Sequence, residues 1–173
     1  MLPNKVAQSG LLTIDLEDWY DPTERVVFDL KEWLFEGLIL REKDFREGLK
    51  QHDFSRYQNK LVSLLCSADA IVPTWAFMLA ASWLEPVARR VAFGTPDRLD
   101  EILYAEKIAS LDPEVYRGQR IVIKGCSKVP VPVSAYTALT TFLRPIARSI
   151  HYGEPCSTVP VYKRPKSQDD SHS

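Results

Sequence analysis

The sequence lacks several features that would place the protein in a specialised class. It has no excess of one charge, since the formal net charge is −1 and the charges are interspersed, so we expect no nucleic acid or acidic membrane surface as partner. No apolar run is long enough for a membrane span: the longest, residues 75–84, is interrupted by Ser82. The first ten residues lack the apolar stretch of a signal peptide. These absences predict a cytoplasmic protein.

Cysteine is scarce. The chain has three, Cys66, Cys126 and Cys156, an odd number with no framework spacing, which favours reduced thiols over structural disulfides. No CxxC or CxxxH spacing brings two metal ligands together along the chain. Any site built from these thiols therefore depends on the tertiary fold.

What the sequence does contain is typical of a globular protein. Its 173 residues, 45% hydrophobic and 26% charged, are enough to bury a core without disulfide or metal staples. We predict one domain over residues 1–162 and a disordered polar tail over residues 163–173.

An internal repeat organises the chain after residue 40. Residues 72–96 align without gaps on residues 131–155 with nine identities in twenty-five positions, where ordinary composition would give about one or two. Upstream, Cys66-Ser67 matches Cys126-Ser127. We interpret these matches as two tandem units produced by duplication. The units cover about residues 41–96 and 97–155, and an N-terminal extension covers residues 1–40.

Each unit is predicted to run helix, strand, helix and short strand. The strands are rich in β-branched and aliphatic residues, and a Val-Pro pair suits the first turn of the second helix. A strand–helix–strand connection favours parallel strands with a right-handed crossover. The predicted class is α/β, a mixed sheet flanked by helices with a strand/helix extension in front. Predicted strands cover 11–16, 26–28, 61–65, 90–93, 121–124 and 149–152; predicted helices cover 41–52, 72–84, 97–110 and 131–143, and helical spacing covers 30–40.

The cysteines define the leading candidate site. Cys66 and Cys126 each follow a predicted strand, at the edge where open α/β sheets bind ligands, and Asp69 lies in the loop beside Cys66. Cys156 stands where the first unit has Asp97. These residue types can hold zinc, iron or an iron–sulfur cluster. Free cysteines are also often simply buried, so a packing role for all three stays open.

Two other functions compete with metal or sulfur binding. Cys126 has Lys124 and Lys128 nearby, and positive charge lowers a thiol pKa, so Cys126 is the catalytic candidate if the protein is a thiol enzyme. The third possibility is an interaction or structural module, expected to be a homodimer, whose cysteines only pack. The acidic run over residues 15–21 is more typical of a solvated turn than of a cation site.

Four stretches resemble a bacterial family known as domain of unknown function 2480. They are WLFEGLILREKDFR from Trp33, CSADAIVPTWAFML from Cys66, IKGCSKVPVPVSAY from Ile123 and GEPCSTVPVYKRP from Gly153. The resemblance implies a cytoplasmic bacterial protein without an established activity. The family's association with gene neighbourhoods for iron–sulfur cluster assembly implies assembly proteins as partners and a role for the three cysteines, which all lie within these stretches.

Overall fold

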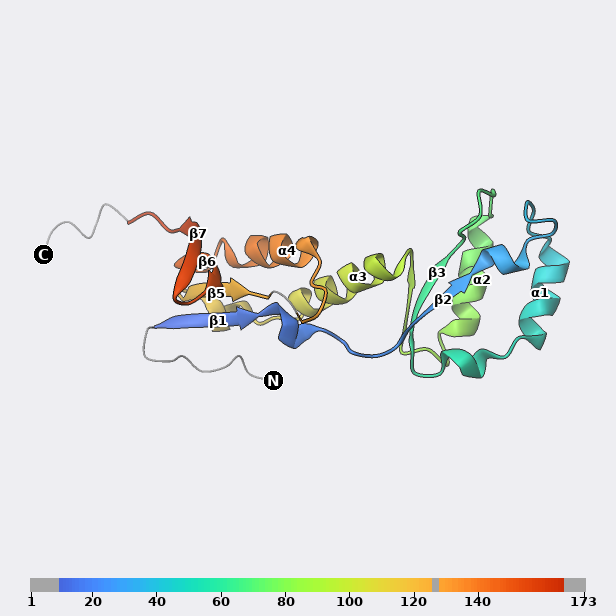
Figure 1. The fold of residues 1–173 in the computed structure, drawn as a ribbon, viewed down its shortest axis with the longest axis horizontal. Helices are drawn as coiled ribbons and strands as arrows, with labels where there is room; N and C mark the ends of the chain where they lie inside the picture. Colours follow the sequence, from blue (N-terminus) through green and yellow to red (C-terminus); the bar gives the residue numbers. More distant parts are fainter. Residues whose placement is uncertain (1–9, 126–127, 167–173) are drawn as a thin grey trace, which may run out of the picture. The chain divides into compact units, whose positions relative to one another are not determined.

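The computed structural model describes residues 10–125 and 128–166. Helices and strands alternate along this part of the chain (Figure 1). The strands are β1 (Leu11–Asp15), β2 (Arg25–Asp29), β3 (Leu61–Leu65), β4 (Arg90–Phe93), β5 (Arg120–Lys124), β6 (Ser149–Glu154) and β7 (Ser157–Lys163). The α-helices are α1 (Glu42–Gln51), α2 (Thr74–Leu84), α3 (Pro96–Ala109) and α4 (Val133–Leu143). Four short 3₁₀ helices are η1 (Leu16–Trp19), η2 (Leu30–Trp33), η3 (Phe54–Tyr57) and η4 (Pro113–Tyr116).

The chain forms two compact units. Unit 1 contains the residues up to Tyr20 and from Leu103 onward, and unit 2 is Asp21–Ile102. The division falls within α3, whose first seven residues belong to unit 2 and the rest to unit 1. Whether the two units act as the single domain expected for residues 1–162 stays a prediction.

Unit 1 is built on a four-stranded sheet in the order β1-β5-β6-β7. The first three strands are parallel, and β7 is antiparallel to β6. Alternate residues of a strand share one face, and here that face is apolar and packs with α4. Its buried cluster includes Leu12, Ile14, Ile121, Ile123, Ile150, Ala135, Leu139 and Leu143.

Unit 2 is built on a three-stranded, entirely parallel sheet in the order β2-β3-β4. Its buried cluster joins strand residues to α1 and α2 and includes Phe28, Val62, Leu64, Phe45, Leu49, Ala76, Ala80 and Leu84. The N-terminal part of α3 is linked to β2, because Arg25 Nε and Nη2 both donate to Asp100 Oδ1, at 2.9 and 2.7 Å.

Aspartates explain where the short 3₁₀ helices begin. Asp15, Asp29, Asp53 and Asp112 each precede one, and each side chain accepts a hydrogen bond from the backbone N–H two residues ahead. A short carboxylate satisfies an N–H that would otherwise lack an intrahelical partner. The strands β1 and β2 therefore both end in a carboxylate at the carboxyl edge of their sheet.

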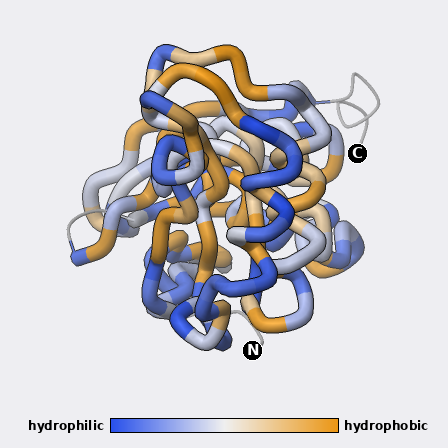
Figure 2. The backbone as a smooth tube through the Cα atoms, turned by 90° about the vertical axis from the view of Figure 1, so that its right-hand side faces the viewer, coloured by the Kyte–Doolittle hydropathy of each residue, from blue (hydrophilic) through white to orange (hydrophobic). Residues whose placement is uncertain are grey.

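The predicted α/β class is confirmed, and every strand predicted within the described residues is present to within two residues at either end. The strands divide into two sheets, one mixed and one parallel. Both units share the order strand, 3₁₀ helix, α-helix, 3₁₀ helix, strand, α-helix, strand; the duplication itself stays an interpretation. Apolar stretches alternate with polar ones along the chain (Figure 2), as this layered packing requires.

One sequence-based expectation was wrong, and one strand was missed. The helical spacing over residues 30–40 gives only η2, because Glu36 and Gly37 take positive φ values of 52° and 71° and turn the chain back into a bridge between Phe35 and Ile39. The strand β7 was not predicted, since Pro160 within it weakens a strand pattern. Lys163 ends β7, so the predicted tail begins inside a strand; residues 167–173 lie outside the described residues.

Candidate functional site

Cys66 lies directly after β3, the central strand of the unit 2 sheet. Its side chain is partly buried against the unit 2 core, and its Sγ lies 3.8 Å from the carbonyl oxygen of Ala68. The following loop is held by Asp29, which accepts hydrogen bonds from Ser67 N (2.9 Å) and Ser67 Oγ (2.5 Å). The expected position of this thiol, at the carboxyl end of a strand, is confirmed.

The other predicted ligands do not gather around Cys66. Asp69 is exposed in the same loop. Cys156 is exposed in the turn between β6 and β7 and belongs to unit 1, while Cys126 lies outside the described residues. Within the residues that the structure describes, no group of three histidine, cysteine or acidic side chains is arranged to hold a metal ion. The shared cysteine site therefore stays a prediction.

At the carboxyl edge of the unit 1 sheet, charges are paired with one another. Lys124 Nζ lies 3.3 Å from Asp15 Oδ2 and 3.6 Å from Glu154 Oε1. The hydrogen bond to Asp15 is the main reason why the pKa of Lys124 is raised. Gly125 follows with a φ of 155° and accepts a hydrogen bond from Tyr136 Oη (2.6 Å).

Carboxylates of the acidic run are also bonded to residues from other parts of the chain. Glu17 Oε1 accepts from the backbone N–H of Lys128 (3.1 Å), and Asp21 pairs with Arg89 at 3.0 Å. The run is a set of turn and ion-pair residues, as the sequence favoured.

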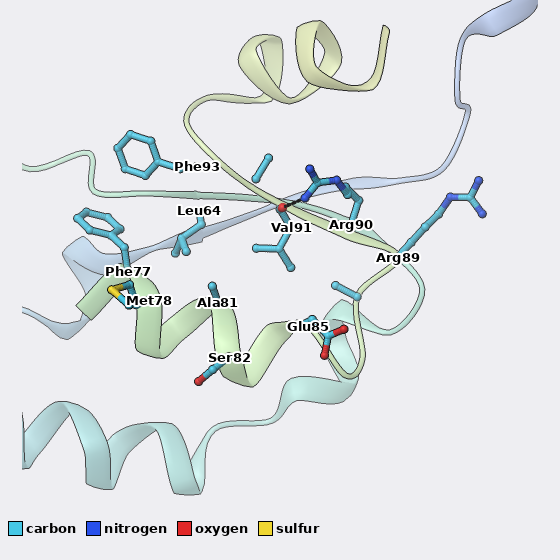
Figure 3. Close-up of a pocket in the computed structure, with 12 residues that line it drawn as sticks. Leu64, Phe77, Met78, Ala81, Ser82, Glu85, Arg89, Arg90, Val91 and Phe93 are labelled. Carbon is cyan, nitrogen blue, oxygen red and sulfur yellow. Dashed lines mark hydrogen bonds between the residues drawn. The ribbon is translucent and has the colours of Figure 1, made fainter. Parts of the chain in front are cut away.

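Unit 2 contains a groove of about 720 Å³ (Figure 3). One wall is a stripe of α2 and the other is β4 with the residues that lead into it. The lining residues are Leu64, Phe77, Met78, Ala81, Ser82, Glu85, Ala88, Arg89, Arg90, Val91, Ala92 and Phe93.

The groove has an apolar end and a charged end (Figure 3). At the apolar end, the rings of Phe77 and Phe93 meet edge to face with centroids 5.2 Å apart. Phe93 is 66% exposed and Met78 is 67% exposed, so this end of the groove presents large apolar side chains to water. Glu85, Arg89 and Arg90 lie toward the other end.

The groove borders an open strand edge. Among the described residues, β4 pairs with β3 alone, and Gly94 N donates to Leu64 O (2.9 Å). In a parallel ladder, alternate residues direct both backbone groups to the same neighbour, so Val91 and Phe93 direct theirs to the open edge. Arg90 Nη1 donates to the carbonyl oxygen of Val91, which blunts this edge.

In unit 1 the corresponding strand is β6, and its second edge is paired with another strand. There β7 pairs with β6, and Tyr162 lies opposite Ile150, the residue that aligns with Val91. The guanidinium of Arg144 lies 4.0 Å above the Tyr162 ring, and Arg164 N donates to Arg148 O (2.9 Å). Unit 2 has no such strand, because its chain enters α3 at Pro96. The groove was not predicted from the sequence, although the two copies differ after Gly94 and Gly153.

The fold and this site define an α/β protein of two units, each with a parallel three-stranded core sheet. A family model described as a protein of unknown function, DUF2480, matches residues 1–164, and the chain belongs to that family. The comparison with curated proteins gave no match, and the comparison with solved structures gave none either.

No helix in the described part of the chain is both long and apolar enough to cross a bilayer.

Proposed function

We propose that the protein is a non-enzymatic binding module that receives an extended polypeptide segment along β4. The observation that carries this proposal is the open β4 edge beside an apolar groove, at the place where unit 1 holds β7 against β6. Strand addition at a sheet edge is a common mode of peptide recognition, in which backbone hydrogen bonds provide affinity and side-chain pockets provide specificity.

The groove defines the chemistry of that segment. Val91 and Phe93 offer backbone donors and acceptors to an antiparallel strand, and the segment residue opposite Val91 is directed toward α2. An aromatic or large aliphatic side chain suits that place, as Tyr162 does opposite Ile150. Where unit 1 has Arg144, unit 2 has Glu85, so a basic residue next to the aromatic one is favoured in unit 2.

A peptide that copies β7, Ser-Thr-Val-Pro-Val-Tyr-Lys, provides a probe. We expect its titration into the labelled protein to shift the amide resonances of Val91 and Phe93. In Val91→Pro, which has no amide proton at position 91, the shift of the Phe93 amide should be lost. Proline is tolerated at an edge position whose N–H is not used by the neighbouring strand, so this variant should fold. The proposal is overturned if neither amide responds to the peptide and both exchange with solvent as freely as exposed loop amides in the protein alone.

The second candidate is an accessory protein of iron–sulfur assembly in the cytoplasm that binds a soft metal, a cluster or sulfur through Cys66, Cys126 and Cys156, with help from Asp69. The observation in its favour is the position of Cys66, a partly buried thiol at the carboxyl end of a central strand whose loop is fixed by Asp29. Such an edge is where ligands bind in open α/β sheets.

Cobalt provides the test of this second function, because thiolate–Co²⁺ charge-transfer absorption reports cysteine ligation directly. Anaerobic titration of the whole chain with Co²⁺ should produce that absorption, and Cys66→Ser should abolish it. Cys156→Ser is a second test, because a site that requires all three thiols should also lose the signal when the exposed Cys156 is replaced. A wild-type protein without charge-transfer absorption and without co-purified zinc or iron rules the candidate out.

A further inference from the structure

We infer that the segment received along β4 is β4 of a second copy of this chain, so that two unit 2 sheets join into one six-stranded sheet across a twofold axis. This inference rests on the binding module proposed above and names its partner. Twofold pairing of identical surfaces is the commonest way in which soluble proteins form closed oligomers.

The backbone of β4 fixes the register of such a pair. Directly opposite residues in an antiparallel pair have side chains on the same face, and the groups turned to the open edge belong to Val91 and Phe93. The register that satisfies both conditions sets Val91 opposite the second copy's Phe93, with Ala92 opposite its own counterpart on the axis. Two hydrogen-bonded pairs result, each exchanging two N–H···O bonds.

This register places a second-copy ring where unit 1 already holds one. In unit 1, Tyr162 of β7 lies opposite Ile150. In the pair, Phe93 of the second copy lies opposite Val91, which aligns with Ile150. The ring then covers the groove beside α2, and the two most exposed apolar side chains of this surface, Phe93 and Met78, leave water together. Burial of apolar surface is the main favourable contribution to such an association.

The placement of Arg90 is also compatible with the twofold arrangement. Arg90 falls opposite Gly94 of the second copy, so the two Arg90 side chains do not face each other across the strands. In the single chain Arg90 donates to Val91 O. That contact has to open before the strands pair, so Arg90 protects the edge of the free chain and slows association without setting the final register.

Sedimentation equilibrium of the full chain tests the stoichiometry. We expect a reversible dimer whose dissociation constant rises at least tenfold in Phe93→Ser and in Val91→Pro. The first variant removes the ring and the second removes an edge N–H, so the two act through different contacts. Ile71→Ser is the matched control, because Ile71 is 94% exposed in unit 2 but does not line the groove; its dissociation constant should stay within about twofold of the wild type, as for an uninvolved surface residue.

A separate measurement tests the register in which the two β4 strands pair. In a non-hydrogen-bonded antiparallel pair the two Cα atoms lie about 4.5 Å apart, so the Ala92 α-protons of the two copies are close enough for a strong nuclear Overhauser effect. A sample mixed from labelled and unlabelled chains should show this effect between copies. A dimer that lacks it, or that persists unchanged in both groove variants, overturns the inference.

The failures of the two proposals are distinguishable. A chain that is monomeric at all concentrations but still binds the β7 peptide at Val91 and Phe93 overturns the second-copy inference and supports the binding module with another partner. A monomer whose β4 amides neither respond to the peptide nor resist exchange overturns both.

Discussion

The carboxylate of Asp29, at the end of β2, accepts two hydrogen bonds from Ser67, which follows β3 38 residues later in the chain. These bonds join the two loops that leave neighbouring strands of the unit 2 sheet. They also determine how Asp29 titrates. Partial burial alone would raise the pKa of Asp29, but the bonds from Ser67 and from the backbone of Lys31 outweigh it, and the pKa is lowered.

Ser67→Ala should therefore destabilise the protein in a pH-dependent way. Removal of the hydroxyl should cost about 1 kcal/mol of unfolding free energy at pH 7, a typical value for one hydrogen bond. Because the folded pKa of Asp29 lies below its unfolded value of about 3.9, this contribution is complete above that value and lost as the pH falls through the folded pKa. Urea unfolding at pH 7 and at lower pH measures it; a wild-type-to-variant difference that stays constant into strong acid contradicts the assignment.

Arg25 and Asp100 form a well-shielded ion pair in unit 2, with side chains 17% and 13% exposed. Arg25→Met leaves the carboxylate of Asp100 shielded from water without this partner, and we expect a cost of about 3 kcal/mol in unfolding free energy. Asp100→Asn in the same chain should recover part of it, because the uncompensated charge is removed. The exposed pair Arg46–Glu42 on α1, at 3.0 Å, supplies the control: Arg46→Met should cost no more than about 0.5 kcal/mol. Equal costs for the two arginine variants would contradict the role of burial.

The fold was predictable where local sequence and packing agree. The strands β3 and β5 are rich in apolar and β-branched residues, and each lies buried between two parallel neighbours in its sheet. The stretch after Trp33 was not predictable in the same way. Its apolar spacing suits a helix, but Gly37 permits a positive φ, and the turn that results buries Leu40 instead. The hydrophobic spacing alone does not show whether such a turn or a helix forms.

The candidate site was predictable only in part. Position after a strand located Cys66 correctly, because the end of a strand can be read from the sequence. Whether the three cysteines come together could not be predicted from the sequence, because it depends on packing between segments far apart in the chain. The groove beside β4 depends on a missing neighbour: Phe93 is exposed because no counterpart of β7 follows Gly94 in unit 2. A single strand's sequence does not report whether its second edge is covered.

His52 should make unit 2 less stable in mild acid. Its ring contacts Phe28, Trp33, Phe54 and Tyr57, with centroids 5.0 to 5.7 Å away. Burial, and then the charge of Arg56, lower the pKa of His52, although Asp53 opposes the shift.

Since the folded pKa lies below the unfolded value of about 6.5, the folded state prefers the neutral ring, and stability falls as the pH drops below that value. The advantage of the wild type over His52→Gln in unfolding free energy should therefore shrink between pH 7.5 and pH 5.5. A proton-NMR titration with a midpoint above that of free histidine would contradict this.

Gly48→Ala reverses the usual effect of alanine in a helix. In an exposed helix interior the exchange gains about 1 kcal/mol, but a Cβ at position 48 of α1 would lie 2.7 Å from Cζ3 of Trp33. That ring is fixed by Phe28, stacked 5.7 Å away, and by Phe45, edge-on at 5.4 Å, so it cannot move aside cheaply. We expect a net loss of about 1–3 kcal/mol, as for other overpacked cores. Trp33→Leu should be the control background, because the smaller side chain removes the clash. There Gly48→Ala should be neutral or stabilising in thermal unfolding, whereas an equal loss in both backgrounds would show that the contact with Trp33 is not its cause.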